Sequence, residues 1–222
     1  MKIIITAATK NEWMQASKQI AALSKVNKPK HQIIFHQSGV GMLSTAVSLM
    51  KVIASEKPNF IIQVGIAGTF NSSQSLAKVF VIKQESIGDL GVTEKGTWKD
   101  IFNLQLQKNN TPPFVKKLLP NQWLKQYNLL KLPAVVAVTV NEITTQKKRK
   151  EQIIQHYNPI LESMEGAALH YVCRTMDIPF LQLRATSNYV GERDKSKWKT
   201  QEAIYNLNET LLEFLDALYK TA

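Results

Sequence analysis

Two stretches of the chain decide its fold: Ser163-Met164-Glu165-Gly166-Ala167-Ala168 and Leu183-Arg184-Ala185-Thr186-Ser187-Asn188. In the first, a Glu stands where a short apolar strand turns into an Ala-rich helix. In the second, an Arg and an Asn stand at the carboxyl end of the next strand. Open α/β sheets bind ligands at the carboxyl ends of their strands. The two stretches therefore predict an α/β fold with a polar cluster of Glu165, Arg184 and Asn188 at one rim of the sheet.

Composition restricts the class of protein. The chain has 222 residues, 44% of them apolar and 20% charged, which is enough to bury one large core. We therefore expect a single domain over residues 1–222. The lone Cys173 lies in an apolar helical pattern, which excludes a disulfide framework and indicates a buried thiol in a reducing compartment. No apolar run reaches the length of a membrane span, and Met1 to Ala8 reads as a buried strand. We expect a soluble, cytoplasmic protein without a membrane partner.

Short β-rich apolar runs alternate with helical periodicity along the chain. The runs predict strands at Lys2–Ala8, Gln32–Gln37, Phe60–Val64, Val79–Ser86, Ala134–Val140, Ile160–Ser163 and Phe180–Thr186. The periodicity predicts helices at Asn11–Leu23, Met42–Ser55, Lys147–His156, Glu165–Met176 and Gln201–Leu218. The segment Gly88–Lys131, with three prolines, is the least regular. We expect it to be an insertion or a flexible loop near a pocket.

Two glycine-rich segments follow expected strands. Ser38-Gly39-Val40-Gly41 opens a helix, and Gly65-Ile66-Ala67-Gly68 follows the strand Phe60–Val64. Turns of this kind let backbone NH groups approach a ligand. Neither is a full dinucleotide fingerprint, and no Walker lysine follows either one. Local sequence therefore leaves open a plain tight turn or a ligand-binding turn.

The sequence around Glu12 allows two interpretations. Thr9-Lys10-Asn11-Glu12 has the spacing of a capping box, in which the Glu merely accepts from a backbone NH at a helix start. The same Glu directly follows the first strand, which would place it on the rim that carries Glu165, Arg184 and Asn188. Both roles remain open from local sequence.

The formal charge of +11 suits either a nucleic acid or a small anionic substrate. The run Lys147-Lys148-Arg149-Lys150 and the series Lys195, Lys197, Lys199 are the features that favour a basic nucleic-acid-binding protein. A solvated helix face explains the first, and there is no recognised nucleic-acid motif or aromatic stacking array. We expect no nucleic-acid partner. The four histidines are scattered without metal-ligand spacing, so we expect no metal and no cofactor, and His170 is expected to be packed or capped.

The order of these motifs resembles the purine nucleoside phosphorylase and methylthioadenosine nucleosidase family over nearly the whole chain. The resemblance rests on Glu12, Gly65–Gly68, Ser163–Ala168 and Arg184–Asn188. Within that family, Ile87-Gly88-Asp89-Leu90-Gly91 and Ser187-Asn188-Tyr189-Val190-Gly191-Glu192-Arg193-Asp194 are most similar to the futalosine hydrolases.

The resemblance implies a three-layer αβα fold with a mixed, partly barrel-like sheet, and a homodimer or higher homo-oligomer whose active site is often completed by a neighbouring subunit. It also implies a role for each matching position. Glu12 would be the base that activates the attacking water, Met164 and Glu165 would hold the ribose, and Arg184 would lie near the water or ribose. Asn188 would face the purine edge that contains N7. Further substrate contacts are expected from Gly65, Ala67 and Ser187.

Two departures from the family pattern bear on the substrate. Relatives that hydrolyse methylthioadenosine carry an Asp at the place of Asn188, and that acid protonates adenine N7. An amide is no comparable acid, but it can donate to O6 of hypoxanthine while accepting from a protonated N7. The second departure is Ile66, where those relatives carry a Ser beside the water. For Asp194 the sequence allows two interpretations, an extra acid or a salt-bridge partner of Arg193.

The expected reaction is hydrolysis of the N-glycosidic bond of futalosine, which releases hypoxanthine during menaquinone biosynthesis. Breaking that bond builds positive charge on the sugar and negative charge on the base, so carboxylates are needed at one end and donors at the other. Water needs a base such as Glu12, whereas phosphate needs several cationic or NH donors. A methylthioadenosine/adenosylhomocysteine nucleosidase and a purine nucleoside phosphorylase are the alternatives.

Overall fold

The computed structural model describes residues 1–24 and 31–221 of the chain. Its strands are β1 (Lys2–Ala7), β2 (Gln32–Gln37), β3 (Phe60–Thr69), β4 (Val79–Ile87), β5 (Gly91–Glu94), β6 (Thr97–Asp100), β7 (Leu119–Pro120), β8 (Ala134–Thr139), β9 (Leu161–Ser163) and β10 (Phe180–Tyr189). Its helices are α1 (Met14–Ser24), α2 (Met42–Glu56), α3 (Leu124–Tyr127), α4 (Lys147–Tyr157), α5 (Gly166–Thr175) and α6 (Thr200–Thr221), with 3-10 turns η1 (Lys10–Glu12) and η2 (Lys195–Lys197).

The main sheet closes partly on itself. Its strands pair in the order β10–β4–β8–β9–β3–β1–β2, and β10 also pairs with β3. That pairing makes a closed ring of β3, β10, β4, β8 and β9, in which parallel and antiparallel neighbours are mixed. β1 and β2 extend the sheet beyond β3 as parallel strands. The expected mixed, partly barrel-like sheet is confirmed.

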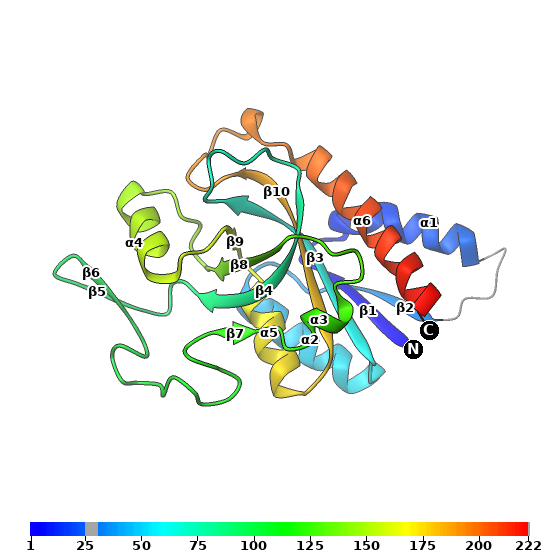
Figure 1. The fold of residues 1–222 in the computed structure, drawn as a ribbon, viewed down its shortest axis with the longest axis horizontal. Coiled ribbons are helices and arrows are strands. Elements are labelled where there is room, and N and C mark those ends of the chain that lie inside the picture. The colour runs from blue at the N-terminus through cyan, green and yellow to red at the C-terminus, as the bar shows by residue number, and fades with distance from the viewer. Residues whose placement is uncertain (25–30, 222) are drawn as a thin grey trace.

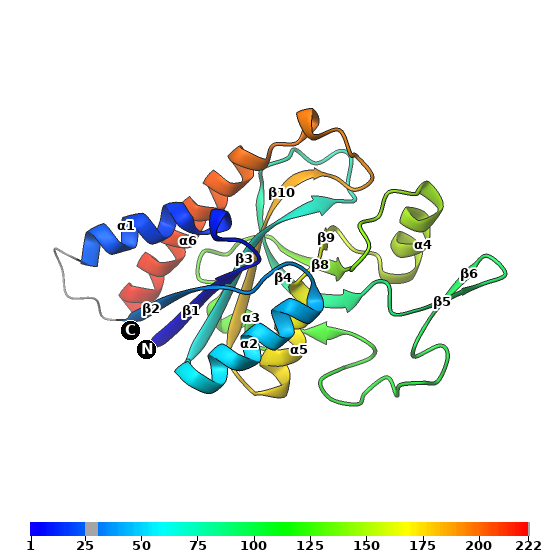
Figure 2. The ribbon, with the colours of Figure 1, turned by 180° about the vertical axis from the view of Figure 1, so that it is seen from behind.

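Helices cover both faces of the open part of the sheet (Figures 1 and 2), with α1 and α6 on one side and α2 and α5 on the other. The alternation of side chains along β1 explains this layering, because successive residues of a strand point to opposite faces. Ile3 and Ile5 belong to the core that includes Leu211 of α6, whereas Ile4 packs with Leu49 of α2 and Leu169. The three-layer αβα arrangement is therefore confirmed.

The segment Gly65–Gly68 is a strand and not the expected turn. β3 runs on to Thr69 because both of its edges are paired there: Gly65 and Ala67 lie opposite Arg184 and Thr186 of β10, and Gly68 lies opposite Glu162 of β9. A sequence rich in small residues looks like a turn until such neighbours are known. β10 likewise continues through Asn188, with a register shift after Thr186. Ser38–Gly41 is a turn, with positive φ at Gly39 and Gly41.

The segment Gly88–Lys131 is more regular than expected. It contains the β5–β6 hairpin, the strand β7 that pairs with β4, and the short helix α3. None of its residues lines the cavity described below. The expected helix Asn11–Leu23 is divided into η1 and α1, and α6 extends further than expected, to Thr221. No helix among residues 1–24 and 31–221 is long and apolar enough to cross a membrane.

Candidate active site

A cavity of about 380 Å³ opens at the rim where β3, β9 and β10 approach the loop after β1. Six of the residues singled out in the sequence line it: Glu12, Ala67, Met164, Glu165, Ser187 and Asn188. Gly65 and Arg184 do not line it. The strand order brings these residues together, because β1 and β10 both pair with β3 and β9 pairs with its far end.

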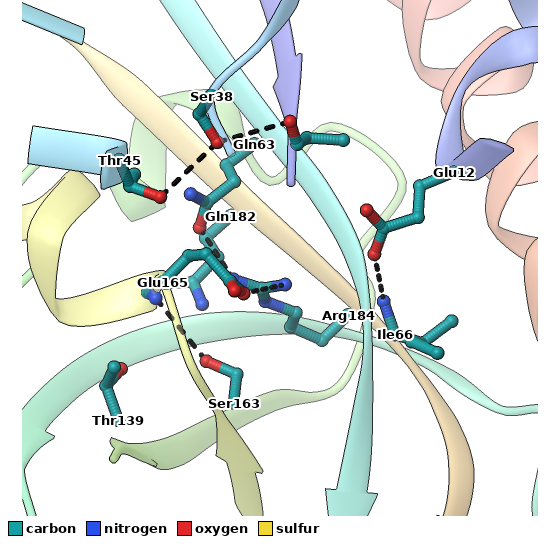
Figure 3. A network of polar contacts seen from close by, with 12 residues as sticks. Glu12, Ser38, Thr45, Gln63, Ile66, Thr139, Ser163, Glu165, Gln182 and Arg184 are labelled. Atoms are coloured by element: carbon teal, nitrogen blue, oxygen red, sulfur yellow. Dashed lines mark hydrogen bonds and ion pairs between the residues drawn. The ribbon is translucent and has the colours of Figure 1, made fainter. Parts of the chain in front are cut away.

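Glu12 both closes a capping box and lies on the rim of the sheet, where it lines the cavity. Its Oε2 accepts from the backbone NH of Thr9 at 2.9 Å, as in a capping box. Its Oε1 accepts from the backbone NH of Ile66 at 3.1 Å (Figure 3), and both residues line the cavity. The group that position 66 offers to Glu12 is therefore a backbone NH and not a side-chain hydroxyl. Burial raises the pKa of Glu12.

Glu165 lies at the N-terminal end of α5 and is also buried. Its Oε1 accepts from the backbone NH of Gly41 at 3.1 Å, and its Oε2 lies 3.6 Å from Arg184 Nη1. The turn that ends at Gly41 therefore directs its NH group at the carboxylate of Glu165. This contact ties Glu165, at the start of α5, to the start of α2.

Arg184 lies behind the cavity wall and does not line the cavity itself. Its side chain is 1% exposed and lies between Glu12 and Glu165 (Figure 3), with Nη2 donating to Gln63 Oε1 at 2.8 Å. A buried guanidinium in this position offsets the negative charge of two carboxyl groups. It lowers the pKa of Glu12, although less than burial raises it.

A second buried layer beneath the site was not expected from the sequence. Glu85 Oε1 accepts from Gln182 Nε2 at 2.9 Å, and Glu85 Oε2 accepts from Thr139 Oγ1 at 3.0 Å. Thr139 Oγ1 in turn accepts from the backbone NH of Ala167 at 2.8 Å, in the first turn of α5. Burial raises the pKa of Glu85 to about 7. The only sequence signal for this layer was polar residues inside otherwise apolar strands, such as Gln182 in β10.

Asn188 stands near the carboxyl end of β10, next to Gly68. Its Oδ1 accepts from Ser187 Oγ at 2.8 Å, and its Nδ2 donates to the carbonyl of Tyr189 at 3.1 Å. These contacts leave one NH and one oxygen lone pair of the amide for a ligand. Gly68 pairs with Asn188, and the NH of Ile66 contacts Glu12. Gly68 follows Ile66 by two residues on β3, so the two positions are about 7 Å apart along the strand. Glu12 and Asn188 thus lie at separate positions along the wall of one cavity.

The expected salt bridge between Arg193 and Asp194 is not the one that forms. Asp194 accepts from the backbone NH of Ser196 at 3.0 Å and lies 3.9 Å from Lys197 Nζ, so it caps η2. The guanidinium of Arg193 lies over the ring of Trp198, 5.5 Å from its centroid. Among the described residues, Arg193 is the one cationic side chain that lines the cavity.

The basic helix α4 is only partly the solvated face that was expected. Arg149 lies over the ring of Trp98 at 4.2 Å and donates to the carbonyl of Gly88, and Lys150 Nζ donates to the carbonyl of Val190 at 3.0 Å. These two side chains therefore fasten the β5–β6 hairpin and the loop after β10 to α4.

The remaining sequence candidates are structural. His170 Nδ1 donates to the carbonyl of Leu119 at 2.7 Å, and burial lowers the pKa of His170 to about 3, so the imidazole is packed and neutral. Cys173 is free and fully buried, as expected. Within the part of the chain that the structure describes, no group of three His, Cys, Asp or Glu side chains is arranged to hold a metal ion.

Comparison with known proteins decides the family. A family model described as the phosphorylase superfamily matches residues 10–220. The chain belongs to this superfamily. That assignment confirms the expected resemblance and makes the chain an enzyme of a class that acts on N-glycosyl compounds.

Three relatives give the finer picture. A futalosine hydrolase of Thermus thermophilus is 26% identical over 82% of this chain and 80% of its own length. A 5′-methylthioadenosine/S-adenosylhomocysteine nucleosidase of Staphylococcus aureus is 24% identical over 74% of this chain and 72% of its own length. The crystal structure of an S-adenosylhomocysteine nucleosidase from Streptococcus pyogenes superposes with a TM-score of 0.76 at 21% identity, over 98% of this chain and 97% of that one. The structural likeness establishes the fold.

Proposed function

We propose that the chain hydrolyses the N-glycosidic bond of futalosine and releases hypoxanthine and dehypoxanthine futalosine, as a step of menaquinone biosynthesis. The observation that carries this proposal is Asn188 on the cavity wall, where an amide stands in place of an acid. Its free NH matches O6 of a 6-oxopurine, and its free oxygen lone pair matches a protonated N7. Adenine presents an amino group in place of O6 and does not match this pair.

Glu12 and Glu165 carry out the sugar chemistry in this proposal. Glu12 takes a proton from the water that attacks the anomeric carbon, and its raised pKa brings it closer to neutral pH, where a general base works best. Glu165 accepts hydrogen bonds from the ribose hydroxyls. Both carboxylates stabilise the positive charge that builds on the sugar as the bond breaks. Asn188 meets the departing base at the other end of the cavity. Because an amide is no acid, the base takes its N7 proton from solvent water, and Glu12 later returns to solvent the proton that it took from the attacking water.

Water fits this cavity better than phosphate as the nucleophile. A bound phosphate needs several cationic or NH donors and is repelled by carboxylates. Glu12 and Glu165 both line the cavity, whereas Arg184 lies behind its wall and already contacts Glu165 and Gln63. We therefore propose hydrolysis rather than phosphorolysis.

Arg193 and Trp198 supply a site for the anionic tail of futalosine. That substrate carries a benzoate-type carboxylate at the far end of its sugar. Arg193 and Trp198 both line the cavity, and the guanidinium of Arg193 lies over the ring of Trp198. A guanidinium beside an aromatic face matches a benzoate in both charge and shape.

The second candidate is a methylthioadenosine/adenosylhomocysteine nucleosidase, which the Staphylococcus aureus relative favours. One experiment separates the candidates. The pure protein is incubated with futalosine, inosine and methylthioadenosine, with and without phosphate, and the released base is identified by chromatography. We expect the wild type to release hypoxanthine from futalosine at a rate that does not depend on phosphate. In Arg193→Ala we expect the KM for futalosine to rise and the KM for inosine to stay unchanged. Faster release of adenine from methylthioadenosine would overturn the proposal.

A further inference from the structure

Glu85 is a fully buried carboxyl group that the proposed reaction does not use. It packs directly behind Glu165, because a Cβ built on the next residue, Gly166, would overlap both Glu85 Oε1 and Gln182 Nε2. The glycine therefore lets the carboxyl group and the amide lie against the first residue of α5. Glu165 precedes that residue, so the charge of Glu85 acts on the end of the helix that carries Glu165.

One oxygen of Glu85 is linked to the backbone of α5. Oε2 accepts from Thr139 Oγ1 at 3.0 Å, and that hydroxyl oxygen accepts from the backbone NH of Ala167 at 2.8 Å. A proton on Oε2 would leave the hydroxyl hydrogen of Thr139 without an acceptor. A proton on Glu85 is therefore placed on Oε1, and the link to α5 stays intact in both charge states of Glu85.

The other oxygen of Glu85 contacts Gln182, whose amide lies between Glu85 and His170. Gln182 Nε2 donates to Glu85 Oε1 at 2.9 Å, and the amide is also a hydrogen-bonding neighbour of the imidazole. His170 Nδ1 donates to the carbonyl of Leu119, so His170 Nε2 presents a lone pair. In the part of the chain that the structure describes, neither His170 Nε2 nor Gln182 Oε1 has a hydrogen-bond partner. Two buried acceptors thus meet at one end of the amide.

Turning the Gln182 amide by 180° pairs these groups if Glu85 is protonated. The turn exchanges the oxygen and the NH₂ group, which occupy nearly equal places. The NH₂ group then donates to His170 Nε2, and the oxygen accepts the proton of Glu85 Oε1. One proton on Glu85 gives each of these buried groups a partner. Burial raises the pKa of Glu85 to about 7 and lowers the pKa of His170 to about 3, so Glu85 holds the proton and the imidazole does not.

We propose that Glu85, in its neutral form, is a positioning residue for Glu165. The inference rests on the proposed function, in which Glu165 binds the ribose and Glu12 is the base. Arg184 pairs with Glu165, and its charge also acts on Glu12 and on Glu85. While Glu85 is neutral, one guanidinium offsets two carboxyl groups. Ionised Glu85 adds a third buried negative charge, which weakens the hold of Arg184 on Glu165.

The elements packed against Glu85 bring few other groups that titrate. β7 and β8, which pair with β4, carry no titratable side chain. On β10 the group that acts on Glu85 is the guanidinium of Arg184, and on α5 it is the neutral imidazole of His170 beyond Gln182. A change in activity that follows the charge of Glu85 is therefore measurable as a separate step in a pH profile.

The pH profile of kcat/KM on futalosine tests the proposal. Ionisation of Glu85 should give the wild type an alkaline limb at or above pH 7. Glu85→Gln keeps the contacts of the neutral acid, because its amide donates to Gln182 and accepts from Thr139, and it does not ionise. We expect the variant to match the wild type at pH 6 and to exceed it about tenfold or more at pH 8.5. The exposed Glu94→Gln is the control and should keep the wild-type profile. A purely structural Glu85 would not move a pH limb, so the same alkaline limb in wild type and Glu85→Gln would overturn the proposal.

Infrared spectroscopy tests the proton of Glu85 without a substrate. The C=O stretch of a neutral carboxyl group is separate from the carboxylate bands. The difference between the spectra of wild type and Glu85→Gln at pH 6 should contain this stretch, and raising the pH to 8.5 should remove it. A carboxylate at Glu85 at pH 6 would refute its role. A protein that shows the neutral carboxyl band but leaves futalosine intact would instead refute the proposed function.

Discussion

Arg184 occupies the space that a side chain at Gly65 would need. A Cβ built on Gly65 would stand 2.0 Å from Arg184 Nη1 and 3.1 Å from Glu12 Oε1. Gly65 thus allows the guanidinium of Arg184 to lie close against β3, near the carboxyl groups of Glu12 and Glu165 that line the cavity. Because Gly65 has no Cβ, the charged guanidinium of Arg184 fits in this buried place.

Gly65→Ala should therefore damage the site more than the fold. Arg184 is held by Gln63 and Glu165, so the added methyl group forces it to shift and disturbs both carboxylates. We expect turnover to fall at least about tenfold, and the free energy of unfolding to fall by about 1 to 3 kcal/mol, as is typical of overpacking. Kinetics and urea unfolding measure the two effects. Gly96→Ala, in the β5–β6 hairpin, is a glycine control that should lose stability but keep its kcat/KM. Unchanged turnover in Gly65→Ala would contradict this account.

Glu12→Gln should lower turnover by about 10² to 10⁴, the usual effect of losing a positioned base. An amide oxygen can still accept from the NH of Thr9, so the fold should remain intact. Burial raises the pKa of Glu12, and a base acts only when deprotonated. The kcat/KM of the wild type should therefore rise with pH through that raised pKa, and the variant should lack this limb. Near-normal turnover in the variant would limit Glu12 to the capping role, worth about 1 kcal/mol.

Glu165 should discriminate ribose from deoxyribose. Removing a hydroxyl that a charged group binds costs on the order of 1.5 to 3 kcal/mol, so the 2′-deoxy substrate should react about ten- to a hundredfold more slowly. In Glu165→Gln the gap between the two sugars should narrow. The measurement is kcat/KM on matched inosine and 2′-deoxyinosine. Equal kcat/KM on the two substrates in the wild type would contradict the proposal that Glu165 binds the ribose hydroxyls.

Asn188→Asp should shift base preference toward adenine. The substitution supplies an acid for N7 and removes the donor to O6, which is worth about 1 to 3 kcal/mol when left unpaired. Ser187 Oγ can still donate to an oxygen at this position, so the side chain should keep its place. The ratio of kcat/KM on futalosine and aminofutalosine, measured in both proteins, decides the matter. A ratio that the substitution leaves unchanged would refute the proposed role of Asn188.

Glu85 should make the protein less stable as the pH rises. Its folded-state pKa of about 7 exceeds the ordinary value of 4.5, so the folded state holds the proton more tightly. The resulting stability is complete below pH 4.5 and is lost as the pH rises through about 7, by about 3 kcal/mol. Glu85→Gln should abolish this contribution. Urea unfolding between pH 5 and pH 8 measures it, with the exposed Glu94→Gln as control. The same pH dependence in wild type and Glu85→Gln would show that Glu85 does not titrate in this range.

The short apolar runs and the helical periodicity were sufficient to predict most strands and helices, and the family resemblance implied the αβα layering. Ile3, Ile4 and Ile5 show why: in a central strand flanked by two helix layers, consecutive residues are all buried, on alternate faces. The rim position of Glu12, Glu165 and Asn188 was predictable for a related reason. Each follows or ends a strand, and the family pattern supplied their order along the chain.

Only the tertiary structure decided what lies on either side of each strand. Gly65–Gly68 reads as a turn in isolation, and it is a strand because β9 and β10 pair with it on both edges. The same pairing buries Arg184 behind the cavity and places Asn188 beside Gly68. Neighbouring residues on a strand specify its faces, whereas partners far apart in sequence, such as Gly68 and Glu162, specify its edges. Local sequence therefore determined which residues are buried or polar, and long-range strand register determined which of them meet.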